Sequence, residues 1–279
     1  IKSDFFIPCD NIGEANDGDK VLVELLDWKK QDLSPIGKIV KVFGEPGDHQ
    51  TELDSIIAKN EITIDFSQEV KDYTELISEK IENKEIKQRR DFREKTTFTI
   101  DPIDAKDFDD ALSFEKIDEN NFEIGIHIAD VSHYVKPSTI LDKEAYNRAT
   151  SIYLVDRVIP MLPEKLSNKV CSLRPNEDKL TFSAVFNFNK KGDINNSWFG
   201  RTIIRSNKRF SYQEAQEIIE TKKNIISKNN SLTGKEYKVE QYIVEAIITL
   251  DDIAKKIRDK REKNVSINFN RTEVGFILD

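Results

Sequence analysis

The sequence predicts an α+β protein in which a small all-β barrel is followed by a larger, mixed α/β domain. Short apolar runs separated by turn residues fill the first 44 positions. Apolar residues alternate from 122 to 128 and again from 182 to 188, and a helical apolar period runs from 239 to 257. The chain has 279 residues, about twice the common domain size, so two separate cores are expected.

The first domain is expected over residues 1–72. Strand-like runs lie at 4–8, 20–25 and 38–44, and Asp17-Gly18-Asp19 forms a turn between the first two. Short strands at this spacing are typical of a small barrel. Helices are expected over 51–62 and 68–85 on their apolar periods. A charged helical linker over 73–95 then separates the domains, and its mixture of acids and bases favours a solvated helix face.

The second domain is expected over residues 96–279. It opens with a β-branched strand at 96–100, and a turn at 118–121 leads into the alternating strand that follows. Another strand precedes the turn at 190–193. Ser211 and Glu214 have the spacing of a capping box, which predicts a helix start there. The long helix at 239–257 comes last.

Composition excludes several classes of protein. Acidic residues number 51 and basic residues 43, a net charge of −8, so charge alone would not hold this chain to nucleic acid. No apolar stretch approaches the length of a membrane span, and no signal peptide opens the chain, so a cytoplasmic protein is expected. Cys9 and Cys171 support neither a disulfide framework nor a zinc site. The chain begins without Met and stops inside an apolar run, which indicates a fragment of something longer.

Five carboxylates crowd into the ten positions from Asp101 to Asp110, between two predicted strands. Unit charges a few ångströms apart repel by about 1 kcal/mol even in water. A hard divalent cation relieves that repulsion, and Mg²⁺ prefers carboxylates, water and substrate phosphate as ligands. The cluster therefore predicts a Mg²⁺ site that acts on a phosphate ester. A solvated acidic loop is the alternative, while the spacing does not fit a calcium-binding EF-hand loop.

The motifs of this chain resemble those of the ribonuclease II/ribonuclease R family, the RNB-domain exoribonucleases. The likeness is carried by Thr99-Ile100-Asp101 through Asp107-Phe108-Asp109-Asp110-Ala111, by residues 125–135, and by Val158-Ile159-Pro160-Met161-Leu162-Pro163. Upstream, Phe6-Ile7-Pro8 and residues 37–42 are similar to a cold-shock domain of the ribonuclease R branch. The resemblance implies a cold-shock-like OB-fold β-barrel followed by a mixed α/β RNB domain, truncated on its C-terminal side.

The resemblance also implies an activity and a set of site residues. The expected reaction is 3′→5′ hydrolysis of single-stranded RNA to nucleoside 5′-monophosphates, with Mg²⁺ or alternatively Mn²⁺ as the cofactor, no organic cofactor, and a monomer as the active form. The family's four aspartates match Asp101, Asp107, Asp109 and Asp110. Its RNA-stacking aromatics match Tyr153 and Phe269. Tyr212 falls near a family tyrosine that contacts the sugar, but its position at the start of a predicted helix fits a packing role equally well. Stacking of this kind tolerates any base sequence.

The chain departs from the family's pattern at its C-terminal end. In the family, an arginine-bearing segment and a glutamate complete the site beyond the point where this chain stops. A noncatalytic module that binds single-stranded RNA is therefore one alternative, and a phosphatase for small esters is another. His127 and His133 alternate around Asp130 and are expected to be structural rather than metal ligands.

Overall fold

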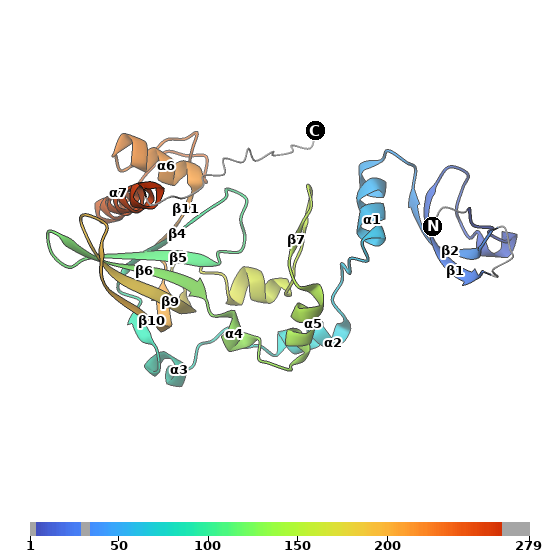
Figure 1. Ribbon diagram of the computed structural model, residues 1–279, viewed down its shortest axis with the longest axis horizontal. Helices are drawn as coiled ribbons and strands as arrows, with labels where there is room; N and C mark the ends of the chain where they lie inside the picture. Colours follow the sequence, from blue (N-terminus) through green and yellow to red (C-terminus); the bar gives the residue numbers. More distant parts are fainter. Residues whose placement is uncertain (1–3, 29–33, 264–279) are drawn as a thin grey trace. The chain divides into compact units, whose positions relative to one another are not determined.

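The structure is a computed structural model that describes residues 4–28 and 34–263. The chain divides into two compact units, Ile1–Phe66 and Ser67–Asp279. Figure 1 shows the helices and strands of each unit. The division expected from the sequence, with boundaries after residues 72 and 95, remains a proposal.

The first unit is built on one antiparallel pair of strands, β1 (Lys20–Asp27) and β2 (Ile36–Gly44). Phe6 makes a parallel bridge to Ile36, and a 3-10 turn spans Cys9–Asn11. Helix α1 (His49–Lys59) begins where the Asp48 carboxylate accepts a 2.9 Å hydrogen bond from the Thr51 amide. Leu53 and Ile57 are its buried apolar side chains.

The second unit contains a seven-stranded sheet that twists strongly (Figure 1) and has the order β11-β4-β5-β6-β9-β10-β3. Neighbouring strands in its middle are antiparallel, while each edge strand runs parallel to its neighbour. The strands are β3 (Arg90–Phe92), β4 (Thr96–Asp101), β5 (Asp110–Lys116), β6 (Asn121–Ala129), β9 (Asp178–Asn189), β10 (Ile194–Arg205) and β11 (Lys208–Ser211).

Two helices pack on one face of this sheet, α6 (Tyr212–Thr221) and α7 (Gln241–Lys263). Ile218 of α6 and Ile243 of α7 meet Phe98 and Phe210 of the sheet, all nearly inaccessible to solvent. Burying each of these side chains contributes about 1.5–3 kcal/mol. The capping box predicted at Ser211 and Glu214 is confirmed.

Short elements complete the second unit. They are α2 (Gln68–Glu75), α3 (Asn83–Lys87), α4 (Val131–Tyr134), α5 (Ile140–Arg148), a π-helical turn (Lys165–Val170), and the strand pairs β7 (Ile152–Tyr153) with β8 (Val158–Ile159) and β12 (Ile225–Ile226) with β13 (Tyr237–Lys238). No helix within 4–28 and 34–263 is long and apolar enough to span a membrane.

Two local expectations were wrong. The helix predicted over 68–85 is broken, because α2 ends at Glu75 and α3 begins only at Asn83. Leu76 is 82% exposed, so the apolar side chains of a longer helix would not have been buried at this point. The Ser78 hydroxyl instead accepts a hydrogen bond from the Lys80 amide, which competes with the helical hydrogen bonds. The charged segment is also not a solvated helix throughout, since Arg90–Phe92 forms an edge strand and Arg89 is buried. The α+β fold class itself is confirmed.

Candidate active site

The predicted aspartates lie on a single strand-loop-strand hairpin. Asp101 is the last residue of β4, Asp110 is the first residue of β5, and the two strands pair from Thr96↔Phe114 to Phe98↔Leu112. Asp107 and Asp109 lie in the loop between them. The hairpin therefore brings the four carboxylates to one end of the sheet; we call residues 102–109 the aspartate loop.

Hydrogen bonds from two other segments of the chain hold the backbone of the aspartate loop. The Phe108 amide donates to the Ser172 hydroxyl at 3.0 Å, and the Phe108 carbonyl accepts the Leu173 amide at 2.8 Å. On the other side, the Ala129 amide donates to the Asp109 carbonyl at 2.9 Å. The Phe108 side chain is itself buried. The loop is thus built into the domain, and its two ends continue as strands of the sheet.

The surroundings of two carboxylates disfavour their charged forms. Asp101 is only 6% exposed, and burial raises its pKa, with Asp110 and then Asp107 adding to the rise. The pKa of Asp109 is raised by desolvation first, and then by Asp107 and Asp110. The charges of Asp107 and Asp110 therefore act on both Asp101 and Asp109. Their shared repulsion means that a cation would be strongly favoured here.

The donor chemistry of the loop fits a hard divalent cation. Oδ2 of Asp101 is buried and meets no hydrogen-bond partner among the described residues. An unpaired carboxylate oxygen is costly to bury, and metal coordination is one way to satisfy it. Within 4–28 and 34–263, however, no three His, Cys, Asp or Glu side chains stand close enough together to form a ready-made metal cluster. The carboxylates therefore fit Mg²⁺ or Mn²⁺ by chemistry, and they would have to converge on binding.

Tyr153 lies within electrostatic reach of the aspartate loop. It ends the short strand β7, pairs with Val158 of β8, and leaves 70% of its surface exposed. Partial burial and then the negative charges of Asp107 and Asp109 raise the pKa of its hydroxyl. An exposed aromatic ring beside the carboxylates is available to stack on a base, whereas a packed core ring would not be.

Tyr212 is also near the aspartates, by strand register. Ser211 pairs with Asp101 across β11 and β4, and Tyr212 follows it directly as the first residue of α6. Its side chain is exposed, so the packing role that the sequence left open is not what the structure shows. Phe269, the other predicted stacking residue, lies outside the described residues.

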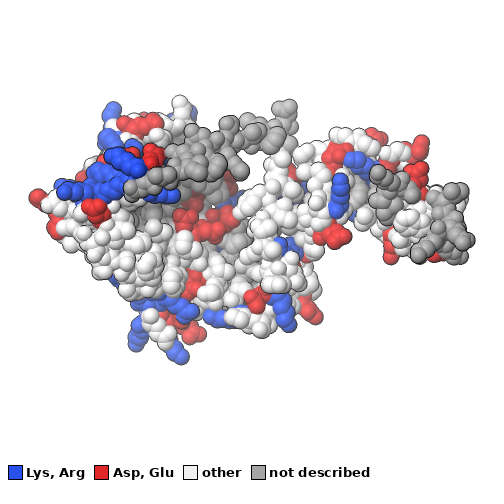
Figure 2. All heavy atoms as spheres, in the orientation of Figure 1, with Lys and Arg blue, Asp and Glu red and all other residues white. Residues whose placement is uncertain are grey.

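Charge is unevenly spread over the surface of the second unit. On the face drawn in Figure 2, acidic side chains gather near the middle of this unit, while basic side chains gather over α7. The last turn of α7 carries Lys260, Arg261 and Lys263. Basic side chains are thus gathered locally on this unit, although the chain as a whole carries a net negative charge.

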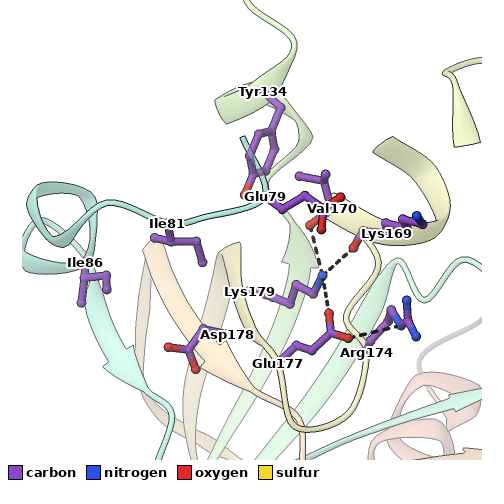
Figure 3. Close-up of a pocket in the computed structure, with 10 residues that line it drawn as sticks. All are labelled: Glu79, Ile81, Ile86, Tyr134, Lys169, Val170, Arg174, Glu177, Asp178 and Lys179. Atoms are coloured by element: carbon purple, nitrogen blue, oxygen red, sulfur yellow. Dashed lines mark hydrogen bonds and ion pairs between the residues drawn. The ribbon is translucent and has the colours of Figure 1, made fainter. Parts of the chain in front are cut away.

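A pocket of about 510 Å³ lies elsewhere in the second unit (Figure 3). Lys179 turns onto the carbonyls of Lys169 and Val170 and forms an ion pair with Glu177, which in turn contacts Arg174. Lys179, Glu177 and Arg174 therefore satisfy one another within this pocket. Of the predicted site residues that the structure describes, none lines it.

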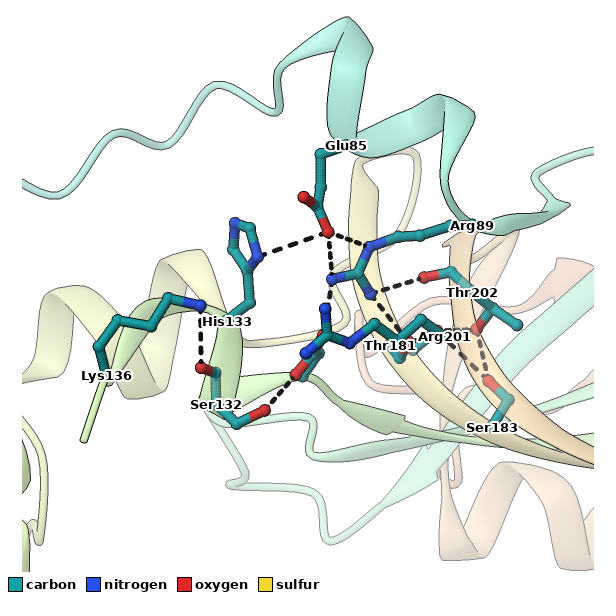
Figure 4. Close-up of polar contacts among 10 residues, drawn as sticks. Glu85, Arg89, Ser132, His133, Lys136, Thr181, Ser183, Arg201 and Thr202 are labelled. Atoms are coloured by element: carbon teal, nitrogen blue, oxygen red, sulfur yellow. Dashed lines mark hydrogen bonds and ion pairs between the residues drawn. The ribbon is translucent and has the colours of Figure 1, made fainter.

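The structure also contains a buried ion pair, between Arg89 and Asp130, that the sequence did not reveal (Figure 4). Arg89 donates to Asp130 at 2.7 Å, to Glu85 at 2.8 Å, and to the carbonyls of Thr181 and Thr202. Asp130 also accepts from the Ser132 hydroxyl. Because Arg89 stood in a charged run, nothing in the sequence distinguished it from its solvated neighbours.

His127 has the structural role that its place in a strand predicted. Its ring is fully buried between the hydroxyls of Ser183, 2.6 Å from Nδ1, and Ser113, 2.8 Å from Nε2. Burial, with a smaller contribution from Arg90, lowers its pKa to about 3. Gly125 leaves room for this arrangement, since an added Cβ would stand 2.4 Å from Ser113 Oγ and 2.6 Å from His127 Nε2. A neutral imidazole is therefore fixed inside the sheet.

Two family models match the chain. Residues 89–279 match the RNB domain, and residues 1–67 match a cold shock domain. In solved structures, ribonuclease R of Mycoplasma genitalium in complex with double-stranded RNA superposes with a TM-score of 0.87 at 24% identity, over all of this chain and 47% of that one. At that identity the likeness shows the fold.

Curated relatives are more similar in sequence. Ribonuclease R of Thermotoga maritima is 37% identical over 281 residues, which is all of this chain and 38% of the relative. DIS3-like exonuclease 2 of Schizosaccharomyces pombe is 38% identical over 261 residues, 92% of this chain and 28% of the relative. An Arabidopsis thaliana protein named inactive exonuclease DIS3L2 is 33% identical over 271 residues, 97% of this chain and 26% of the relative. The chain thus spans less than two fifths of the length of these relatives.

Proposed function

The chain belongs to the RNB-domain family, to which the ribonuclease R proteins are homologous, and from this premise we propose that it carries the metal-binding part of a 3′→5′ exoribonuclease. The proposed substrate is single-stranded RNA, and the proposed products are nucleoside 5′-monophosphates. The observation that carries the proposal is the placement of Asp101, Asp107, Asp109 and Asp110 on one hairpin, with Tyr153 within electrostatic reach of Asp107 and Asp109. We also propose the three-part division into 1–72, 73–95 and 96–279.

The aspartate loop is suited to phosphodiester chemistry when a divalent cation is bound. Mg²⁺, or Mn²⁺ in its place, would lower the pKa of a coordinated water and offset the charge on the leaving oxygen. Asp101, Asp107, Asp109 and Asp110 would hold the cation through their carboxylate oxygens. The raised pKa values of Asp101 and Asp109 support this assignment, because burial and mutual repulsion penalise their charges until a cation compensates them.

Tyr153 and Tyr212 would orient the RNA end beside these carboxylates. Stacking on Tyr153 would contribute about 1–3 kcal/mol per base without preference for a sequence, as a degradative enzyme requires. Tyr212 precedes the body of α6 and follows the residue that pairs with Asp101, so its hydroxyl is suited to contact the sugar of the terminal nucleotide. Phe269 is proposed as the opposing stacking residue.

A noncatalytic RNA-binding protein is the second candidate. It is favoured by one observation, the 33% identity to a relative whose name calls it inactive. The four aspartates of this chain argue against that candidate, because a binding module would gain nothing from their repulsion.

The test is to incubate single-stranded oligoribonucleotides, labelled at the 5′ end in one set and at the 3′ end in the other, with Mg²⁺ and size the products over time. Both this chain and the whole protein are assayed, since the chain spans 38% of the length of the Thermotoga relative. The proposal expects the whole protein to release labelled mononucleotide from the 3′ end at once. Tight RNA binding without shortening would favour the second candidate, and internal cuts would contradict the exonucleolytic direction.

A further inference from the structure

Arg209 is joined to the aspartate loop from a different strand. It lies in β11, opposite Thr99 of β4 in the parallel register. Its Nη2 donates to the Pro102 carbonyl at 2.8 Å and to the Ile103 carbonyl at 2.9 Å. One guanidinium nitrogen thus bridges two successive carbonyls in the first turn of the loop.

The same guanidinium also covers an aromatic ring of the loop. Its central carbon lies 4.8 Å from the centroid of the Phe108 ring, within the range of a cation-π contact. Phe108 stands between Asp107 and Asp109 in the sequence. Arg209 therefore contacts both ends of the aspartate loop, at 102–103 and at 108.

Within the loop, this tether reinforces a turn. The Pro102 carbonyl that accepts from Arg209 also accepts the Ala105 amide at 3.1 Å, which closes the turn before Asp107.

We propose that Arg209 is a positioning residue that fixes the backbone of the aspartate loop before any cation arrives, so that only the carboxylate side chains have to converge on binding. This inference rests on the proposed function, because it assumes that the aspartates bind a cation. The contact between Arg209 and the loop can nevertheless be tested independently of the RNA reaction. Residues that orient metal ligands typically change metal affinity or activity by about 10- to 100-fold when removed. Arg209 would act on the carboxylates through the loop backbone and would not contact the substrate.

The first test is hydrogen exchange in metal-free protein. Arg209→Met should speed exchange of the Ala105 and Phe108 amides by about 10-fold or more, because the loop would open locally more often. Arg90→Met is the matched control. Arg90 lies on the opposite edge strand, β3, and its guanidinium also stands 4.8 Å from a phenylalanine ring, that of Phe92. This control should leave both amides unchanged.

The second test measures binding of Mn²⁺ by the electron paramagnetic resonance signal of the free ion. Arg209→Met should weaken binding by about 10- to 100-fold, and Arg90→Met should not. Arg209→Lys keeps the charge but not the fork of donors, so an intermediate affinity is expected. If Arg209→Met fails to fold, hydrogen exchange and Mn²⁺ binding are both measured on Arg209→Lys instead.

The outcomes separate this inference from the proposed function. Unchanged exchange at Ala105 and Phe108 together with unchanged Mn²⁺ affinity would overturn the tether, whatever the RNA assay shows. Full wild-type behaviour of Arg209→Lys would also overturn it, because charge alone would then explain the contact. If the RNA is not degraded but exchange and Mn²⁺ affinity change as expected, the tether stands and the proposed reaction fails.

Discussion

Arg89 donates a 2.7 Å hydrogen bond to Asp130, and the two side chains are 0% and 3% exposed. Asp130 directly follows β6, whose last residue, Ala129, donates its amide to the carbonyl of Asp109. The buried ion pair therefore anchors the stretch of backbone that holds the aspartate loop. It also joins α3 to the sheet, because Arg89 binds Glu85.

Loss of this pair should cost stability. We expect Arg89→Met to lower the free energy of unfolding by about 3–5 kcal/mol, because it leaves the Asp130 charge buried without a partner. Urea unfolding followed by circular dichroism measures the change. Arg205→Met is the control, since Arg205 pairs with Asp178 at an exposed position and its loss should change the free energy of unfolding far less. Equal effects of the two substitutions would show that the buried pair has no special role.

Tyr153 should bind the RNA through its ring. We expect Tyr153→Ala to weaken binding of single-stranded RNA by about 1–3 kcal/mol, whereas Tyr153→Phe keeps most of the affinity. Fluorescence anisotropy of a labelled oligoribonucleotide checks both. Tyr146→Ala supplies the control, because Tyr146 is 85% exposed on α5. The assignment would be wrong if Tyr153→Ala and Tyr146→Ala bound RNA alike.

The sequence predicted much of this fold because its strongest signals are local. The alternation of Phe122, Ile124, Ile126 and Ile128 foretold β6, and Ser211 with Glu214 foretold the start of α6. The broken helix after Glu75 could not be predicted, because it depends on which apolar side chains are buried in the folded domain.

In the site, the acidic motif drew attention to the loop, whereas Arg89 and Arg209 act through partners that are distant in sequence. No local feature of the sequence around Lys208, Arg209 and Phe210 distinguished the second of these from an ordinary basic residue.

Mg²⁺ should stabilise the folded protein in a pH-dependent way. The folded-state pKa values of Asp101 and Asp109 are raised, so the folded protein binds more protons than the unfolded chain between the ordinary pKa and the raised one. Metal-free stability contributed by these groups is therefore greatest at acid pH and is lost as the pH rises through that window. At neutral pH, saturating Mg²⁺ at about 10 times its dissociation constant should add about 1.4 kcal/mol.

Differential scanning calorimetry measures this gain. In Asp109→Asn the Mg²⁺-dependent rise in Tm should be largely lost, while the metal-free Tm is equal to or higher than that of the wild type, since one repelling charge is gone. Asp104→Asn, in the same loop, should keep the rise. A Mg²⁺ effect of equal size in Asp109→Asn would count against the metal site.

His127 should make the protein sensitive to acid. Its folded-state pKa is lowered to about 3, so the unfolded chain binds a proton that the folded protein excludes. The stability it contributes is complete above its ordinary pKa and is lost as the pH falls from there toward about 3, by at most about 1.4 kcal/mol per pH unit. Nuclear magnetic resonance should show an imidazole that does not titrate across the physiological range, and His127→Gln should flatten the acid limb of the stability profile. An imidazole that titrates near its ordinary pKa would contradict the buried neutral ring.

The aspartate loop as a catalytic metal site is tested most directly by release of mononucleotides from a 3′-labelled oligoribonucleotide by the whole protein in Mg²⁺. We expect Asp109→Asn to lower the rate by about 100-fold or more, since this carboxylate would hold the cation that supplies several kcal/mol of transition-state stabilisation. Affinity for RNA should stay within about 3-fold of the wild type, because stacking on aromatic side chains does not need this carboxylate. Asp104→Asn should retain its rate. Wild-type turnover by Asp109→Asn would contradict the assignment.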